Sequence, residues 1–378
     1  MTARIQKFLA DQQPATPCLV IDLDVVRGNY EALARSLPFA RIYYAMKANP
    51  APAVMSMLAG MGSSFDTASI YEIREALIAG APAERISFGN TVKKQSDIAE
   101  AYRLGVRLFA FDSEGELEKL AVAAPGAKVY CRLRLELSKT ADWPLGGKFG
   151  CSLDMARDLL MKAGELGLDA YGVSFHVGSQ QRDAGEWDMA VGRAAMLFTD
   201  LRERGVNLRL LNVGGGFPAH YRTEAASHAD HATALTAALV KHFSNRMPEV
   251  LIEPGRSLVG DAGMIRSEVV LVSQKAYDGP RWVYLDIGKF GGLIETMDEA
   301  IKYRVTTSRD SDGGESSRVI LAGPTCDEVD ILYQKTAYHL PDDLRPGDTV
   351  DFLSAGAYTS TYSSVCFNGL PPLKTYCV

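Results

Sequence analysis

Short apolar runs separated by amphipathic segments dominate the first two thirds of the chain. Eight such runs occur, at residues 42–46, 63–65, 85–88, 108–111, 129–133, 171–175, 208–213 and 250–252. Segments with helical spacing of apolar residues lie between them, including residues 51–59, 70–79, 153–166 and 187–204. Alternating strand and helix patterns predict βαβ units and a parallel sheet. Eight units in roughly 220 residues fit a (β/α)8 TIM-like barrel, whose usual length is about 250 residues.

Polar residues and glycines follow directly after many of these runs. They are Lys47, Asp66, Asn90, Asp112, His176, residues 214–216 and Glu253. Active sites of (β/α)8 barrels are built from the loops at the carboxyl ends of the strands. An open doubly wound sheet also fits the alternation, but it would concentrate ligand contacts near one switch point. We therefore predict a barrel domain over residues 23–261.

The pattern changes after about residue 261. Residues 267–273, 281–286, 318–322 and 349–353 are strand-like, with little helix between them. Residues 308–317 are polar and contain glycine, which predicts a flexible loop. Residues 17–22 are also strand-like, and we expect them to pair with the C-terminal strands. The prediction is a second, β-rich and Greek-key-like domain made of residues 1–22 plus 262–378.

Composition and charge narrow the class of protein. The 378 residues are 47% hydrophobic and 23% charged, as in ordinary soluble proteins. The net charge of −6 argues against nucleic acid or an anionic membrane as a partner. We expect a cytoplasmic protein, because neither an apolar signal-peptide core nor a span of ~20 apolar residues occurs. No two of the six cysteines form a CxxC pair, so neither a zinc site nor a disulfide framework is expected.

The strand-end residues supply the groups that pyridoxal phosphate needs. Lys47 offers an amine for a Schiff base, and we expect its desolvation to lower its pKa. The glycines at 214–216 expose backbone N–H groups suited to a phosphate, and Arg256 could add a charged fork. His176 offers a ring for stacking. Glu253 could keep the pyridine nitrogen protonated, which makes the ring an electron sink.

Each of these features alone has a simpler interpretation. Lys47 could extend from a strand end to solvent, and three glycines often form a plain turn. Glu253 and Arg256 could form a surface ion pair, and His176 could be a hydrogen-bonded core histidine. Their occurrence together, each after an apolar run, favours the cofactor site.

At this point the motifs resemble the fold-type III pyridoxal-phosphate decarboxylases of basic amino acids, the ornithine decarboxylase family. The matching segments are YAMKAN at 44–49, FDTAS at 65–69 with Glu72, FHVGS at 175–179, GGGFP at 214–218, EPGR at 253–256, GPTCD at 323–327, GAYT at 356–359 and FNG at 367–369. The resemblance runs from about residue 16 to the C-terminus, and the order of the motifs makes it specific.

The resemblance implies a role for each matching position. Lys47 would carry the cofactor, His176 would stack on its ring, and Glu253 would pair with its nitrogen. The implied cofactor contacts also include Asp66, Arg132, Ser179, Gly215, Gly216, Gly255, Arg256 and Tyr358, with Glu72 helping to organise the lysine. Cys326 would reprotonate Cα, and Asp327 would contact the distal amine of the substrate. Phe367 would line the active site. In the family, Cys326 and Asp327 would come from the other subunit of a homodimer.

A second acidic substrate contact belongs in residues 291–299, where the register is ambiguous. We choose Asp298, with Glu295 and Glu299 as rivals. The implied reaction is the decarboxylation of L-ornithine to putrescine, a step of polyamine biosynthesis. Lysine is a close alternative, because one methylene is worth only ~1–3 kcal/mol of discrimination.

Three further alternatives stay open at this point. A diaminopimelate decarboxylase shares several motifs but typically has Glu-Ser after the cysteine, where this chain has Asp327. An alanine-racemase-like enzyme would place an arginine, not Glu253, on the ring nitrogen. A non-catalytic regulatory homologue would have lost cofactor residues, whereas Lys47, Glu253, Arg256 and Cys326 are all present.

Overall fold

The computed structural model describes residues 1–135, 140–143 and 146–378. Eight parallel strands close into a barrel in the order β10-β11-β2-β3-β4-β5-β6-β8. These strands are β2 (Ala40–Ala45), β3 (Ser64–Thr67), β4 (Ile86–Phe88), β5 (Leu108–Phe111), β6 (Lys128–Arg132), β8 (Asp169–Ser174), β10 (Leu210–Asn212) and β11 (Glu249–Ile252). Each of the eight predicted runs overlaps one of them, so the predicted barrel is confirmed.

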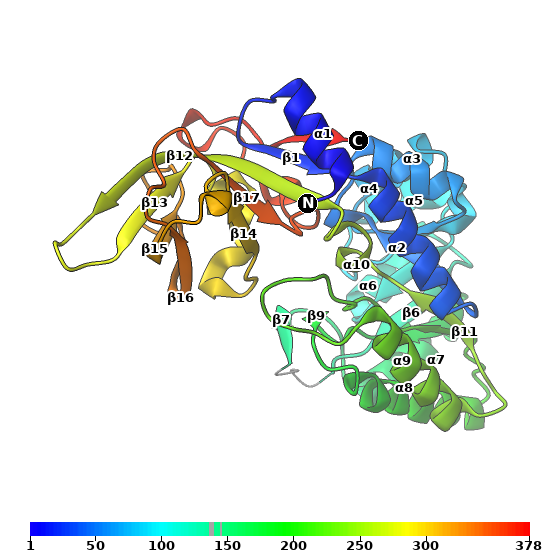
Figure 1. Cartoon of the computed structure of the whole chain (residues 1–378). Coiled ribbons are helices and arrows are strands. Elements are labelled where there is room, and N and C mark those ends of the chain that lie inside the picture. Colours follow the sequence, from blue (N-terminus) through cyan, green and yellow to red (C-terminus); the bar gives the residue numbers. More distant parts are fainter. Residues whose placement is uncertain (136–139, 144–145) are drawn as a thin grey trace.

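Helices surround the barrel on its outside (Figure 1). They are α2 (Leu23–Ser36), α3 (Pro52–Gly60), α4 (Ile70–Ile78), α5 (Gln95–Arg103), α6 (Glu114–Ala123), α7 (Leu153–Glu165), α8 (Glu186–Glu203), α9 (His228–Phe243) and the short α10 (Arg256–Val259). The four predicted helical segments match α3, α4, α7 and α8 to within one residue at each end. Among the described residues, no helix is long and apolar enough to cross a membrane.

Large side chains fill the inside of the barrel. A buried cluster unites residues from β2, β5, β6, β8, β10 and β11, namely Tyr43, Leu108, Ala110, Tyr130, Tyr171, Leu210 and Leu251. A barrel interior packed in this way is a core and not a pore. Ligands are therefore restricted to the loops at the ends of the strands.

The second domain is a mixed sheet built from both ends of the chain. Its strands are β1 (Cys18–Ile21), β12 (Gly263–Gln274), β13 (Arg281–Leu285), β14 (Arg304–Thr307), β15 (Ser316–Ala322), β16 (Ile331–Pro341), β17 (Thr349–Leu353) and β18 (Lys374–Cys377). The main path runs β14-β17-β12-β13-β15-β16, and β1 pairs with both β12 and β18. The predicted pairing of the N-terminal strand with the C-terminal strands is confirmed.

Some details of this domain differ from the prediction. The loop predicted over residues 308–317 is shorter in the structure. A 3-10 turn at Asp310–Asp312 and the start of β15 occupy part of this segment. The sequence analysis also missed β14, β16, β18 and the helix α1 (Ala3–Gln12). Short turns, rather than helices, connect the strands around the junction. They are Lys289–Leu293, Ile294–Glu299, Ser360–Tyr362 and Phe367–Gly369.

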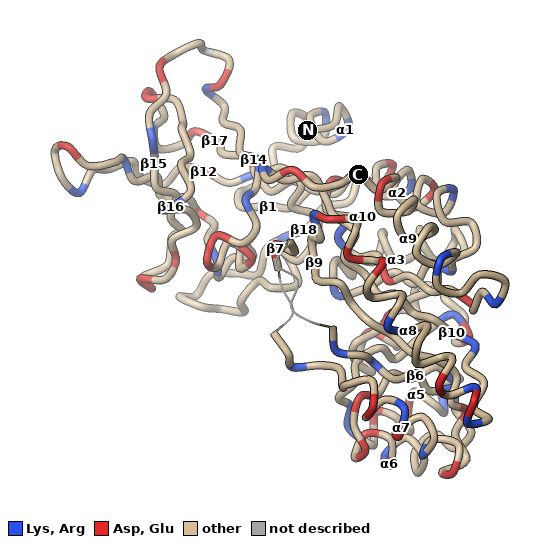
Figure 2. The backbone as a smooth tube through the Cα atoms, turned by 90° about the horizontal axis from the view of Figure 1, so that it is seen from below, with Lys and Arg blue, Asp and Glu red and all other residues tan. Residues whose placement is uncertain are grey.

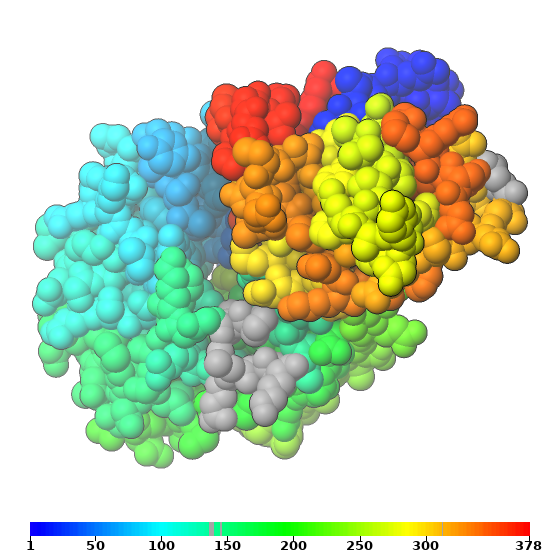
Figure 3. Space-filling view, turned by 90° about the vertical axis from the view of Figure 1, so that its left-hand side faces the viewer, coloured from blue at the N-terminus to red at the C-terminus, as the bar shows by residue number. Residues whose placement is uncertain are grey.

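The two parts pack against each other along one side of the barrel. A space-filling view shows the second domain, coloured yellow to red, seated against barrel residues in cyan and green (Figure 3). A small antiparallel ribbon of β7 (Ala141–Trp143) and β9 (Ser179–Gln181) belongs to the barrel side. Basic and acidic segments are interspersed over both parts (Figure 2), which agrees with the modest net charge.

Candidate active site

Lys47 lies in a tight turn directly after β2, at the junction of the two domains. The Asn49 amide of the same loop donates to the Gly356 carbonyl at 2.8 Å. The backbone N–H of Tyr358 in turn donates to the carbonyl of Ala48 at 2.8 Å. The loop that carries the lysine is therefore fixed by backbone of the second domain, which also delivers Tyr358 to the barrel mouth.

Electrostatic neighbours decide the charge of Lys47. Burial by itself would lower its pKa, but Tyr358 and the carboxylates of Asp66 and Glu253 outweigh that effect. The pKa of the Lys47 amine is raised above its ordinary value. The expectation of a lowered pKa is therefore wrong, because carboxylates from two other strands face the lysine. In the free protein these neighbours favour the charged form of the Lys47 amine.

Asp66 is the penultimate residue of β3 and is almost fully buried. The hydroxyl of Ser87 donates to its Oδ1 at 3.0 Å. A Cβ at Gly89 would lie 1.9 Å from the same oxygen, so only glycine fits beside the carboxylate. Burial raises the pKa of Asp66 well above its usual range, and the negative charge of Glu253 adds to that shift. Lys47 is the cation that opposes it.

Glu72 is held by the start of α4. The Ser69 hydroxyl caps this helix by accepting from the N–H of Glu72 at 3.3 Å. The Glu72 carboxylate reaches back to accept from the N–H of Ala68 at 2.6 Å. Burial raises its pKa, and the positive charge of Lys47 opposes that shift. The cap therefore fixes a carboxylate within the electrostatic reach of the lysine.

Glu253 follows β11 and is held by Asn212 at the end of the neighbouring strand β10. The Asn212 amide donates to Glu253 Oε1, and its own oxygen accepts from the N–H of Gly214 at 2.8 Å. The backbone N–H of Glu253 donates to the Gly214 carbonyl at 2.8 Å. The Glu253 carboxylate is thus oriented by the same loop that presents the glycines. The alternative of a surface pair between Glu253 and Arg256 is not what the structure contains.

The glycines at 214–216 form a cradle into which no side chain fits. A Cβ at Gly215 would lie 2.6 Å from the Glu253 carbonyl oxygen, and one at Gly216 would lie 2.7 Å from the Gly178 carbonyl oxygen. Gly214 and Gly216 also have φ values of 71° and 117°, which disfavour other residues. Backbone in this conformation presents N–H groups without side chains, as a phosphate requires.

His176 is uncharged at the barrel mouth. Its Nδ1 accepts from the N–H of Gly178 at 2.9 Å. Burial, with the positive charges of Arg132 and Lys47, lowers its pKa to about 3. A neutral imidazole with an occupied Nδ1 carries its proton on Nε2. That edge faces the glycine cradle, because a Cβ at Gly215 would lie 3.7 Å from Nε2.

Arg256 is buried and forms contacts that the sequence analysis did not foresee. Its two terminal nitrogens donate to both oxygens of Glu295 at 2.6 and 2.7 Å. They also donate to the Tyr221 hydroxyl at 2.8 Å and the Ser179 hydroxyl at 3.2 Å, while the guanidinium lies 4.8 Å from the centre of the Tyr358 ring. The expected fork toward a phosphate is therefore already bound to a carboxylate. Among the described residues, the buried Nε of Arg256 has no partner.

The unpaired Nε–H of Arg256 and the glycine cradle at 214–216 show whether the site fits pyridoxal phosphate. A phosphate oxygen would satisfy the unpaired N–H, and the backbone N–H groups of the cradle suit its other oxygens. Lys47, His176 and Glu253 surround the same mouth with an amine, a neutral ring and an oriented carboxylate. The donor set of the site therefore fits the cofactor.

The three rival acids at 291–299 have different surroundings. Glu295 is paired with Arg256. The carboxylate of Glu299 accepts three backbone N–H groups from residues 334–336, at 2.6–2.8 Å. Asp298 is exposed, and its carboxylate has no hydrogen bond or ion pair with any described residue. It lines a cavity between the two domains together with Arg132 from the barrel.

Cys326, Asp327 and Phe367 gather elsewhere on the second domain. The backbone N–H of Cys326 donates to Asn368 Oδ1 at 3.0 Å, and Asn368 Nδ2 lies 3.4 Å from its sulfur. The ring of Phe367 lies 4.5 Å from that of Phe290, centre to centre. Cys326 and Asp327 are exposed, and the described lining of the cavity with Arg132 includes neither. The side-chain contacts of Cys326 among the described residues are to Asn368 of the same domain.

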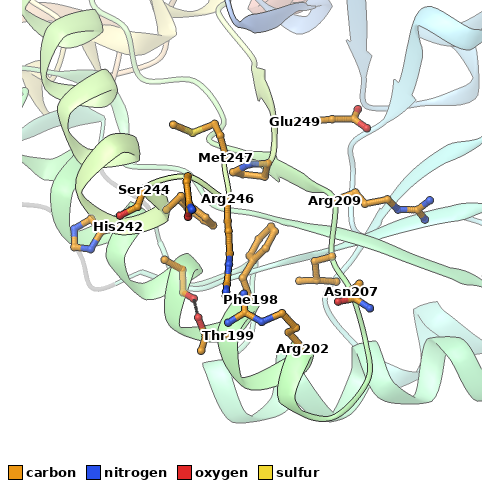
Figure 4. A pocket seen from close by; sticks show the side chains of 15 residues that line it. Phe198, Thr199, Arg202, Asn207, Arg209, His242, Ser244, Arg246, Met247 and Glu249 are labelled. Carbon is orange, nitrogen blue, oxygen red and sulfur yellow. Dashed lines mark hydrogen bonds between the residues drawn. The ribbon is translucent and has the colours of Figure 1, made fainter.

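Another hollow lies at the opposite end of the barrel (Figure 4). It is lined by the C-terminal parts of α8 and α9 and by the segments that lead into β10 and β11, with Phe198, Arg202 and Arg246 among its residues. These are the N-terminal ends of the barrel strands. The predicted chemistry is all at the other end or on the second domain, so the candidate active site is not this hollow.

Sequence reasoning missed several residues that hold the site together. They are Ser87 beside Asp66, Asn212 beside Glu253, and Tyr221 and Glu295 beside Arg256. Ser87 and Asn212 each lie within a barrel strand next to that of the acid they bind, which gave a weak signal. Glu295 was considered only as a substrate contact.

Comparison with known proteins agrees with this site. Residues 23–260 match the family described as "Pyridoxal-dependent decarboxylase, pyridoxal binding domain". A lysine/ornithine decarboxylase of Selenomonas ruminantium is 35% identical over 365 residues, which cover 96% of this chain and 89% of that protein. Mouse ornithine decarboxylase is 34% identical over 373 residues, covering 95% and 80%.

A solved structure shows the same likeness in three dimensions. The lysine/ornithine decarboxylase of Vibrio vulnificus, crystallised with cadaverine, superposes with a TM-score of 0.88 at 30% identity. The match covers 100% of this chain and 99% of that one. The protein therefore belongs to the fold-type III pyridoxal-phosphate-dependent decarboxylases of basic amino acids, the family of ornithine and lysine decarboxylases.

Proposed function

We propose that this member of the family decarboxylates L-ornithine to putrescine and CO2. The observation that carries the proposal is the carboxylate of Asp298, which lines a cavity with Arg132 and has no partner among the described residues. A free carboxylate suits a distal ammonium group, and Asp327 offers a second one beside Cys326. The bound diamine in the Vibrio vulnificus relative supports a site of this kind.

The cofactor site is proposed residue by residue. Bound pyridoxal phosphate supplies the electron sink that lets the carboxylate leave Cα as CO2. Lys47 would bind the cofactor through its amine and release it to the amine of the substrate. Glu253, oriented by Asn212, would keep a proton on the ring nitrogen. His176, neutral and held by Gly178, would cover one face of the ring.

The remaining residues hold the phosphate and the lysine. The proposed phosphate contacts are Ser179, Gly215, Gly216, Gly255, Arg256 and Tyr358. Asp66 and Glu72 would keep the Lys47 amine charged and in place until the cofactor arrives, because Asp66 is buried, Glu72 is half-buried and both lie within its electrostatic reach. Arg132, on the cavity wall with Asp298, would orient the cofactor face toward the substrate.

Cys326 is the proposed acid that returns a proton to Cα. It is exposed in one chain and close to Phe367 and Asn368, so we propose that a second copy of this chain brings it to the site. The proposed units are residues 23–261 as the cofactor-binding barrel, and residues 1–22 plus 262–378 as the domain that shapes the homodimer interface. Asp327 and Phe367 would then reach the substrate from that neighbour.

Lysine is the second candidate substrate, favoured by the lysine/ornithine decarboxylases among the relatives. The difference of one methylene is worth only about 1–3 kcal/mol, so one site can accept both amino acids. Diaminopimelate differs more, because its distal end carries a carboxylate that Asp298 and Asp327 would repel.

Product analysis with ornithine, lysine, arginine and diaminopimelate tests the proposal. Purified protein with added pyridoxal phosphate is given each amino acid separately, and CO2 and amine are quantified. We expect putrescine from ornithine at the highest kcat/KM and cadaverine from lysine at a lower one. A higher kcat/KM for diaminopimelate or arginine would overturn the assignment of the distal contacts, and a higher value for lysine would reverse the order of the two candidates.

A further inference from the structure

The ion pair between Arg256 and Glu295 is among the most deeply buried charges in the described chain. Both side chains are only 3% exposed, and the two carboxylate oxygens accept from the two terminal nitrogens of the arginine. Burying such a pair costs desolvation energy that its own attraction does not always repay. Because stability alone does not explain this buried pair, and because it lies next to the proposed phosphate site, we looked for a functional role.

The hydrogen-bond partners of the N–H groups of Arg256 suggest a functional reason for this pair. A guanidinium has five N–H groups, two on each terminal nitrogen and one on Nε. One terminal nitrogen donates to Glu295 and Tyr221, and the other to Glu295 and Ser179. Only the N–H on Nε stays unpaired among the described residues. The hydroxyl of Ser179 accepts from the arginine, so its own hydrogen is available to another acceptor.

We infer that Glu295 is the positioning residue for the cofactor phosphate. It fixes Arg256 in the orientation that directs the Ser179 hydroxyl and the Nε–H of Arg256 toward the phosphate arm. The backbone N–H groups of the glycine cradle provide the other contacts. The inference rests on the proposed placement of the phosphate, but it does not depend on which amino acid is the substrate.

The position of Glu295 in the fold supports this role. It belongs to the turn Ile294–Glu299 of the second domain, whereas Arg256 begins α10 directly after barrel strand β11. Asp298 lies on the same turn. One short segment of the second domain thus carries both the partner of the phosphate-binding arginine and the free acid proposed for the substrate. The pair also ties the second domain to the loop that follows Glu253.

Cofactor affinity of Glu295→Gln tests the inference without reference to turnover. The full-length chain, freed of cofactor, is titrated in parallel with pyridoxal phosphate and with pyridoxal, which lacks the phosphate. Gln keeps the shape of Glu but cannot accept from both terminal nitrogens of Arg256. We expect about a tenfold or greater loss of affinity for pyridoxal phosphate and no change for pyridoxal.

The chain offers a matched control. Arg266 and Asp351 form a similar bidentate pair in the second domain, with distances of 2.8 and 2.7 Å. Asp351→Asn removes the acid of that pair, and we expect its affinity for pyridoxal phosphate to equal that of the unmodified protein. Tyr221→Phe removes a second acceptor of Arg256, and about a threefold loss is expected. This variant keeps the test possible if Glu295→Gln does not fold.

Three results would overturn the inference. The first is unchanged affinity of Glu295→Gln for pyridoxal phosphate, or of Tyr221→Phe if only that variant folds. The second is an equal loss for pyridoxal, since the effect would then not act through the phosphate. The third is an equal loss in Asp351→Asn, since any broken ion pair would then produce it. A failure of ornithine turnover with the expected binding pattern would contradict only the proposed substrate.

Discussion

The barrel mouth and the exposed cluster of the second domain hold their reactive residues in opposite ways. At the mouth, Asp66, Glu253 and Arg256 each have hydrogen-bond partners within the same chain. In the exposed cluster, Cys326 and Asp327 face solvent. Their described contacts are to neighbouring loop residues such as Asn368.

This difference separates binding of the cofactor from completion of the reaction. Buried charges must be paired inside the chain, so one subunit can build a complete cofactor pocket. A thiol that delivers a proton to Cα must work where water is excluded, which an exposed position does not provide. The exposed cluster is therefore suited to a neighbouring copy, as the proposed homodimer requires.

Lys47→Ala should have the largest effect, and it tests the residues at the barrel mouth. Turnover should be abolished, because no other lysine lies among the residues of the cofactor site. The rival is Lys93, a lysine that is buried in the barrel and whose pKa burial lowers to about 8. Its amine is bound to Glu116 at 2.9 Å. Borohydride reduction and peptide mapping should locate the pyridoxyl group on Lys47, and a label on Lys93 would contradict the assignment.

Glu253→Gln should reduce kcat by about a hundredfold or more while leaving cofactor affinity within a few fold. The amide cannot hold a proton on the ring nitrogen, whereas the phosphate contacts are unchanged. Steady-state kinetics and a titration with pyridoxal phosphate measure the two effects separately. A near-normal kcat would show that Glu253 is not the partner of the nitrogen.

Cys326→Ala should release CO2 but make less than one diamine per CO2. Without the thiol, the proton is no longer delivered to Cα, and kcat should fall by about a hundredfold. Both products are quantified in one reaction mixture. Cys366→Ala is the matched control, because that cysteine is also exposed and lies in the adjacent loop. Unit stoichiometry at the normal rate in Cys326→Ala would remove this cysteine from the mechanism.

Asp298→Asn should raise KM for ornithine by about tenfold, because the contact with the distal ammonium loses its charge. Glu299→Gln is the control, since the Glu299 carboxylate is occupied by backbone N–H groups. That variant should lose stability, measured as Tm, with little change in KM. The reverse pattern would assign the substrate contact to Glu299.

Mixing Lys47→Ala with Cys326→Ala subunits gives the smallest signal but tests the comparison directly. In a mixed dimer with shared sites, one site carries both lesions and the other carries neither. If half of all dimers are mixed, about a quarter of the unmodified activity should return. Sites confined to one chain would return none. No recovery despite demonstrated subunit exchange would mean that Cys326 acts within its own chain.

The barrel was predictable from the sequence because its signal is local. Each strand is a short apolar run that must be buried, and each ends at a polar residue or glycine. Lys47, Asp66, His176 and Glu253 could be placed at one end of the barrel from this pattern alone. The second domain was less predictable, since the sequence analysis missed the partly exposed strands β14 and β16.

The tertiary structure decided which acid does what between residues 291 and 299. Met297 has an extended ψ of 132°, while Asp298 and Glu299 have φ values of 52° and 57°, so no helical or strand period applies there. Side-chain direction in such a turn depends on what packs against it. Only the folded chain pairs Glu295 with Arg256, satisfies Glu299 with backbone and leaves Asp298 without a partner in the described part of the chain.

The sequence by itself determined the eight-stranded barrel, the cofactor class and the residues at the strand ends. Only the tertiary structure decided the direction of the Lys47 pKa shift, the partner of Arg256 and the exposure of Cys326. The physical reason is the separation along the sequence over which each interaction acts. Burial and periodicity act between neighbours along the chain, whereas a pKa or an ion pair depends on groups that folding brings together from distant strands.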